Sequence, residues 1–510
     1  MKQFFGIHLA AFLAIYASSA AAKTGASELN PAEQWVVTQV KAGEIADLSK
    51  QFPDEEDKRK LSAHFVEALL TGTLPDVKPG RRGVRISRAI IEEPVDLVTA
   101  QIPCEVWLYN CKFKASASFM GASFPGTIVF QKSAFQADAN FNSIKVRGTA
   151  FFDGAVFEGL ADFVLADIIG NFEAKGAQFQ NEEKTANFNG MKVGGAAFFN
   201  DAVFEGPAIF TVADIANGFV AEGAKFQNKE KTADFTGMKV RGTAIFTEAV
   251  FEGPASFVKA EIPILFRASG AKFQNKEKTA DFTRMTVGDA FFDDAVFEGA
   301  VNLRHADFGW LDLSGSIWPK VADQFNMQGM SYKYIRAAPL SDEHKSHEVL
   351  LRLANQSAYS ADVYGNLEAF FLRQGDRGDA DQAFIEGKRR ERREYLRGLP
   401  WLGSWLLDCL VGYGRRPWQA GIPCVFFVAL GCVLFSPKKM EPQKPEDTPR
   451  VYNRFWYSLD LFLPFINLQA DDVWKPKTNE RFLRHYVRLH VMLGWILIPI
   501  VLAALTGLIK

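Results

Sequence analysis

The sequence repeats a phenylalanine-rich unit every 47 residues. Phe141, Phe188, Phe235 and Phe282 recur at this step, in the settings ANFNS, ANFNG, ADFTG and ADFTR. Further phenylalanine series keep the same step, so that three full copies and a partial fourth span about residues 139–299. A register maintained over this length predicts a stack of equivalent units, each packing on the next.

Within each copy, a shorter period of five residues restricts the backbone. In SASFMGASFPG, Phe119 and Phe124 lie five residues apart, and each has alanine two residues before it and glycine two residues after it. A five-residue period matches neither the 3.6-residue period of a helix nor the two-residue period of a strand. We therefore predict a four-sided coil with five residues per side, in which the alanine and the phenylalanine of each side point inward.

This pattern resembles the pentapeptide-repeat proteins over roughly residues 84–318. The resemblance implies a mainly β fold, a right-handed quadrilateral β-helix. Coils stacked about 4.8 Å apart would place equivalent rings in ladders. The rings that we expect in these ladders are Phe119, Phe124, Phe141, Phe157, Phe163, Phe172, Phe179, Phe188, Phe204, Phe210, Phe219, Phe226, Phe235, Phe251, Phe257, Phe266, Phe273, Phe282 and Phe297.

Each 47-residue unit is then two coils plus an excursion of about seven residues. The polar segments 181–186, 228–233 and 275–280 (NEEKTA, NKEKTA and NKEKTA) supply this excursion, and we expect them to stack on one face. Their mixed charges indicate solvated turns, with contact to a partner as the alternative. The formal net charge of −1 does not favour a nucleic-acid partner.

The N-terminus has the features of a signal peptide over residues 1–22. Lys2 precedes an apolar stretch, and residues 20–22 are alanines that offer a cleavage site before Lys23. An uncleaved anchor is the alternative. Residues 23–83 include apolar residues at helical spacing, and we expect a helical cap over the open end of the solenoid.

No catalytic, cofactor or metal constellation emerges from the sequence. The five cysteines form no CxxC pair, although Cys104 and Cys111 lie close enough in sequence for a disulfide. No GxGxxG motif follows an expected strand. His344 and His347 lie on an expected helix without the acidic or cysteine neighbours that a metal site needs, and the same holds for His485 and His490. We therefore predict neither an enzyme nor a bound cofactor.

Residues 319–416 are expected to form a helical linker domain, with a helical hairpin that turns near residues 375–378. It carries the strongest basic cluster in the chain. The cluster either contacts anionic lipid headgroups or is a solvated helix face. The candidate headgroup contacts are Lys388, Arg389, Arg390, Arg392, Arg393, Arg415 and Arg416.

Residues 417–510 are expected to form a membrane domain. Segments 418–435 and 489–509 are apolar enough for two transmembrane helices, and segment 455–468 is expected to lie in the interface or to re-enter. The run VGYG at 411–414 also occurs in potassium-channel filters. Here it precedes the first span and is followed by arginine, so we interpret it as a turn that enters the membrane.

Together with the helical segment before it, this C-terminal region resembles that of bacterial membrane-associated pentapeptide-repeat proteins. The resemblance implies a rod that is anchored in the bacterial inner membrane, and we expect it to bind an unidentified protein or envelope partner. Ala503 and Gly507, four residues apart, either allow close helix packing and hence homo-oligomers or face lipid. We favour a periplasmic rod because of the signal peptide, although the positive-inside rule does not decide the topology. The alternative function is a two-span channel-like assembly with the rod as its sensing or regulatory domain.

Overall fold

The structure is a computed structural model that describes residues 29–319, 324–338, 343–443 and 451–506. The predicted signal peptide therefore lies outside the described residues. The chain forms two compact units, one of residues 1–326 and 332–346 and the other of residues 327–331 and 347–510. We describe each unit by itself.

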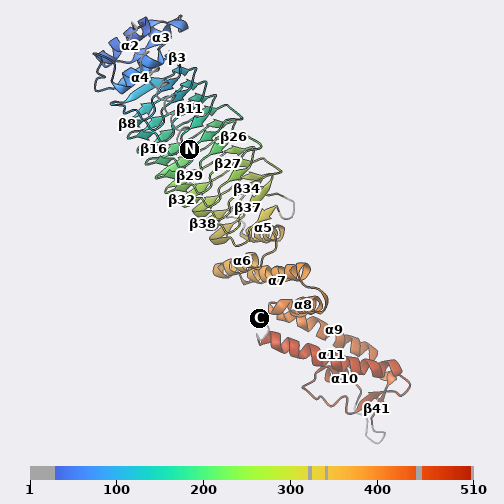
Figure 1. Cartoon of the computed structure of the whole chain (residues 1–510). Coiled ribbons are helices and arrows are strands. Elements are labelled where there is room, and N and C mark those ends of the chain that lie inside the picture. The colour runs from blue at the N-terminus through green and yellow to red at the C-terminus, as the bar shows by residue number, and fades with distance from the viewer. Residues whose placement is uncertain (1–28, 320–323, 339–342, 444–450, 507–510) are drawn as a thin grey trace, which may run out of the picture. The chain divides into compact units, whose positions relative to one another are not determined.

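The first unit is a parallel β-solenoid of about 11 turns, which confirms the predicted four-sided coil (Figure 1). In one coil, the four sides are β10 (Ala134–Phe135), β11 (Ala139–Asn140), β12 (Lys145–Val146) and β13 (Ala150–Phe151). The next coil begins with β14 (Val156–Phe157), which pairs with β10 in parallel. A 10-stranded sheet and an 11-stranded sheet form two sides, and a 19-stranded sheet turns a corner to form the other two.

The coils are longer than the predicted five residues per side. Successive inward residues Phe135, Phe141, Val146, Phe152 and Phe157 are separated by six, five, six and five residues, so this coil has 22 residues. Coils that carry a polar loop have 25 residues. The predicted excursion of seven residues is therefore wrong. Three residues enter each loop, and the other four lie at two corners of each of the two coils, where one additional residue separates the inward side chains.

Three of the four inner columns consist of stacked rings. In the two columns below the 10- and 11-stranded sheets, neighbouring phenylalanines are nearly parallel, as for Phe204 and Phe226 (4.9 Å between ring centroids, 1° between planes). Rings of the third column lie farther apart, as for Phe199 and Phe219 (5.5 Å, 32°). Edge-to-face contacts join the columns, so the interior is a continuous aromatic lattice, an arrangement that ring quadrupoles favour.

All nineteen of the expected rings are buried, and eighteen of them belong to these ring columns. Phe124 instead stands in the fourth column, which is otherwise aliphatic over most of its length, and it pairs with Val146. The third column contains rings that the five-residue pattern missed. These are Phe130, Phe152, Phe199, Phe246 and Phe292.

The polar loops stack on one face, as predicted. Each loop begins with an asparagine that caps its own turn, and the asparagines of the second and third loops also reach the preceding loop. Asn228 Nδ2 donates to the Glu182 carbonyl (3.1 Å), and Asn275 Nδ2 donates to the Lys229 carbonyl (3.0 Å). The loop packs tightly on the following AVFEG segment, where a Cβ on Gly253 would lie 2.0 Å from the Asn228 carbonyl oxygen. Glycine is needed at this position because the loop backbone occupies the space of a side chain.

Helices cover the N-terminal end of the solenoid. α2 (Pro31–Ala42) begins with a capping box formed by Asn30 and Glu33. Buried Glu33 also accepts hydrogen bonds from the backbone and hydroxyl of Ser62, which precedes α4 (Ala63–Thr71). The short strand β1 (Ala46–Asp47) pairs with β2 (Val84–Ser87). α3 (Leu48–Gln51) follows β1 directly in the chain.

At the other end, strands continue beyond the expected limit at residue 318. β39 (Phe325–Asn326) still pairs with β37 (Ala300–Asn302), and β40 (Ser331–Arg336) joins the 19-stranded sheet. The later part of the chain is helical. Its α-helices are α5 (Glu343–Gln356), α6 (Ala361–Gln374), α7 (Arg377–Glu394), α8 (Gly398–Val411), α9 (Gly421–Leu434), α10 (Arg454–Phe462) and α11 (Arg481–Leu505).

Candidate functional site

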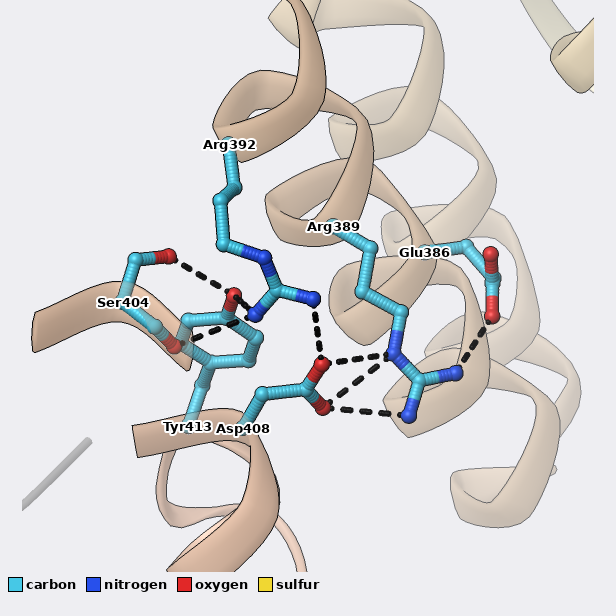
Figure 2. Close-up of polar contacts among 6 residues, drawn as sticks. All are labelled: Glu386, Arg389, Arg392, Ser404, Asp408 and Tyr413. Atoms are coloured by element: carbon cyan, nitrogen blue, oxygen red, sulfur yellow. Dashed lines mark hydrogen bonds and ion pairs between the residues drawn. The ribbon is translucent and has the colours of Figure 1, made fainter. Parts of the chain in front are cut away.

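The basic cluster of α7 binds the single acidic residue of α8. Arg389 donates to both carboxylate oxygens of Asp408, with Nε 3.1 and 2.9 Å from them, and Arg392 donates to one of them at 2.9 Å (Figure 2). Glu386, one turn before Arg389, accepts a further hydrogen bond from its guanidinium group (2.8 Å). With Ser404 and Tyr413, these residues form what we call the arginine–aspartate network. The network joins α7 to α8 through charged groups that are partly buried.

Asp408 is ionised within this network. Its side chain is 8% exposed, and this burial by itself would raise the pKa of the carboxyl group. The hydrogen bonds from Arg389 and Arg392 outweigh burial, so the pKa lies below its usual value. Two guanidinium groups on one carboxylate satisfy its lone pairs, which is the condition under which a buried charge is tolerated.

The VGYG run is the turn that follows α8, as predicted. Gly412, Tyr413 and Gly414 have φ values of 52°, 52° and 87°. This left-handed region is ordinary for glycine but costs a tyrosine about 1–3 kcal/mol. Tyr413 is held there by its hydroxyl group, which accepts from Arg392 (2.8 Å) and lies 2.8 Å from the Ser404 hydroxyl. The turn therefore belongs to the arginine–aspartate network.

Other residues of the predicted headgroup set have partners within the protein. Lys388 pairs with Glu391, and Arg390 pairs with Glu394 and donates to the Ala354 carbonyl. Arg415 pairs with Glu368 and Asp381, and its guanidinium lies 4.5 Å from the ring centroid of Phe384. In the described part of the chain, no ion pair involves Arg393 or Arg416. Headgroup contact by the cluster stays a prediction.

Two helices after this network are long and apolar enough to cross a membrane, by length and composition. They are Pro417–Leu434 and Arg481–Ala503. The first agrees with the predicted span within one residue. The second begins eight residues before the predicted start at 489, because the helix continues through Arg481, Arg484 and Arg488 at its polar end. Segment 455–468 is helical over its first half, as α10, and is not a loop throughout.

α10 packs against α9 and α11 through small and polar residues. Ser458 donates to the Val428 carbonyl (2.9 Å), and its hydroxyl lies 3.2 Å from Nε2 of His490, which is fully buried. A Cβ on Gly431 would lie 2.2 Å from the Ser458 hydroxyl oxygen. Gly431 therefore permits the close approach of α9 and α10, and His490 has a packing role that the sequence did not indicate.

The acidic residues at the end of α10 and in the connection that follows it are partly enclosed. Asp460 is 7% exposed and accepts hydrogen bonds from the backbone N–H groups of Leu468, Ala470 and Asp471. It thereby fixes the connection from α10 toward α11. Burial, with the neighbouring Asp460 carboxylate as the next cause, raises the pKa of Asp471 to about 6. Asp460 is therefore enclosed by the protein and not solvated.

The interpretation of His347 was wrong, because this residue does have acidic neighbours. Its Nδ1 lies 2.5 Å from Asp379 and 3.6 Å from Asp376. His347 also contacts the ring of Phe371, and Asp376 caps the first turn of α7 through the backbone of Asp379. Both aspartates thus serve helix packing and capping. The three side chains could hold a metal ion by geometry, and the 30 or so intervening residues concealed this proximity in the sequence.

On the solenoid, an outward column of apolar side chains runs along the side that contains β13. It includes Trp107, Val129, Phe151, Phe198 and Phe291, and the charged residues Glu173 and Arg267 interrupt it. Cations lie over several of these rings, as Arg85 over Trp107 (5.6 Å) and Lys175 over Phe198 (4.6 Å). We call these residues the outer aromatic column. The paired letters FF at 151–152, 198–199 and 291–292 mark it, since one ring points inward and its neighbour outward.

A cavity of about 640 Å³ opens where this column meets the N-terminal cap. Ile45, Arg85, Trp107, Tyr109 and Phe151 are among its lining residues. Within the described residues, the buried Nε atom of Arg85 and the indole N–H of Trp107 have no hydrogen-bond partner. Both atoms are buried, so the cavity presents mainly aromatic and apolar surface. Cys104 and Cys111 near this end are both free thiols, so the disulfide that their spacing allowed is not formed.

Comparisons with known proteins give no assignment: no family model, curated protein or solved structure matches the chain.

Proposed function

We propose that this protein is a membrane-anchored scaffold of the pentapeptide-repeat type, which presents a β-solenoid to a protein or envelope partner and carries out no catalysis. The observation that carries the proposal is the combination, in one chain, of a rigid repeat domain and two helices long and apolar enough to cross a membrane. We place the anchor in the bacterial inner membrane and the solenoid in the periplasm, on the basis of the N-terminal signal pattern.

The partner surface in this proposal is the outer aromatic column with its cavity. The half-buried aromatic side chains offer apolar contact area to a partner, and the cations above them can orient it. Aromatic residues and arginine are enriched in protein interfaces. Elsewhere on the coil, exposed apolar side chains such as Leu165, Ile169 and Val212 carry no aromatic ring. On the neighbouring side, outward residues alternate in charge, as for Lys145, Asp167, Lys192 and Asp214, and such a ladder is well solvated without a partner.

Membrane anchoring is tested by alkaline extraction of membranes from cells that make the full chain or a chain that ends at residue 416. The full chain should stay in the membrane pellet, and the shorter chain should be released. Release of both, or retention of both, contradicts the proposal that α9 and α11 are the anchor.

Partner binding is tested by a photo-crosslinking amino acid placed at Phe151 of the outer aromatic column. The matched control is Gln178, an outward residue of β18 (Gln178–Phe179) on another side of the coil. We expect one discrete adduct from position 151 and none from position 178. Equal labelling at both positions, or none at either, argues against the column as the partner surface.

The channel alternative draws no support from the VGYG run, because its backbone forms a left-handed turn bound to Arg392. Purified protein in a planar bilayer provides the test. Reproducible ion-selective currents would overturn the scaffold proposal.

A further inference from the structure

α8 exposes large apolar side chains along one side. Its sequence, GLPWLGSWLLDCLV, has one charged residue in 14. Leu399 is 82% exposed, and Leu402, Trp405 and Leu406 are each exposed by 42–44%. At 100° per residue these four side chains fall within one arc of the helix, together with the exposed Cys409. Trp401 and Leu407, exposed by 41% and 42%, widen this arc on either side. We call this arc the α8 apolar face.

The opposite side of α8 is bound to the rest of its unit. Asp408 receives Arg389 and Arg392, the Ser404 carbonyl accepts from Arg392 (3.2 Å), and Val411 is fully buried. The helix is therefore fixed in rotation about its axis, and the apolar face is held outward by ion pairs.

Length and composition decide what covers this face. Fourteen residues extend about 21 Å, which is too short for a bilayer core of about 30 Å. Tryptophan and leucine on one face of a helix are typical of segments that lie within the membrane interface. The first candidate span begins at Pro417, six residues after α8 ends, so the chain that leaves α8 enters that span directly.

We propose that α8 lies in the plane of the bilayer surface, with the α8 apolar face at the boundary between headgroups and acyl chains. The arginine–aspartate network acts as the clamp that holds α8 in this orientation on α7. In this arrangement Arg389 and Arg392 act on the lipid only through α8, because their guanidinium groups bind Asp408. The inference rests on the proposed membrane anchor, and the test separates the two.

The test uses a spin label on the native Cys409, in the full chain reconstituted into lipid nanodiscs. Cys104, Cys424 and Cys432 are replaced by serine, and the wholly buried Cys111 is retained. Relaxation by oxygen and by a water-soluble nickel chelate reports the depth of the label. We expect the label at position 409 to lie about 5–10 Å below the phosphates.

Two reference positions carry the label in a Cys409→Ser background. Gln382, exposed on α7, should report water, and Val428 in α9 should report the bilayer core. If the label at position 409 reports the same water exposure as the label at Gln382, while the label at Val428 lies in the bilayer core, the membrane anchor is supported and the inference on α8 is overturned. If Val428 is also in water, both proposals fail. Shielding of position 409 from both oxygen and nickel would mean a protein contact, such as a second copy, and would likewise overturn the inference.

The clamp has its own readout. With the label on Cys409, Asp408→Asn should leave the depth of Val428 unchanged but make the 409 label more mobile and its depth more heterogeneous. Gln382→Asn is the matched control and should change neither. An Asp408→Asn spectrum identical to that of the parent would contradict the clamp.

Discussion

Replacement of Phe199 by alanine should strongly destabilise its part of the solenoid. The ring is fully buried and lies between Phe172 and Phe219, at 5.4 and 5.5 Å, with edge contacts to Phe188 and Phe210 at 5.2 and 5.1 Å. A buried phenylalanine truncated to alanine costs about 3–5 kcal/mol, and the rigid ring columns on every side limit collapse of the cavity. We expect a loss of about 4 kcal/mol.

The adjacent residue provides a control with the same chemical change. Phe198 points outward, is half-buried, and contacts the Lys175 ammonium group, which lies 4.6 Å from its ring centroid. Such a contact contributes about 0.5–1 kcal/mol. Phe198→Ala should therefore cost about 1 kcal/mol.

Hydrogen exchange of the full-length protein is the suitable assay, because a solenoid opens locally and a single unfolding free energy is not defined for it. In the coils next to β21 (Ala197–Phe198), Phe199→Ala should accelerate exchange by about a thousandfold, and Phe198→Ala by less than about tenfold. Equal acceleration by the two variants would refute the inward assignment of this column.

Three further predictions concern single positions. Gly253→Ala should displace the loop at Asn228, since the new Cβ would lie 2.0 Å from its carbonyl oxygen, and limited proteolysis of the loop should become faster. The folded pKa of Asp408 lies below its usual value, so the arginine–aspartate network stabilises the protein above about pH 4. This contribution is lost as the pH falls through the folded pKa. Urea unfolding followed by fluorescence should show this loss in the parent protein but not in Asp408→Asn. Gly431→Ala should push α10 away from α9 through Ser458, lowering the melting temperature in detergent more than Gly421→Ala, whose Cβ meets no atom within 4 Å.

The solenoid could be predicted because its long-range contacts recur at a fixed sequence separation. Phe141 stacks on Phe163, 22 residues away, and the same step joins Phe188 and Phe210. The pattern did not determine the corners, since an added residue leaves the inward side chains in register. The pattern also did not show which residue of each FF pair points inward. Phe198 and Phe199 are chemically identical, so composition does not distinguish them.

The helix junction could not be predicted in the same way. Its contacts join residues whose separation has no period, such as Arg389 with Asp408, 19 residues apart. Asp408 is the one charged residue in an otherwise apolar run at the end of the predicted linker domain, and the sequence contains no signal for its partner. The pairing of His347 with Asp379, 32 residues later, depends on the packing of two helices. The turns near residues 375–378 and at residues 412–414 did have a local signal, their glycines.

The central claim is that a core of stacked phenylalanines forms a rigid solenoid carried by a lipid-embedded anchor. A cryo-microscopy reconstruction of the full chain in a nanodisc tests this claim most directly. It should resolve three columns of rings inside a four-sided coil, with lipid around α9 and α11. Rings directed into solvent, or α9 and α11 outside the lipid, would contradict the account.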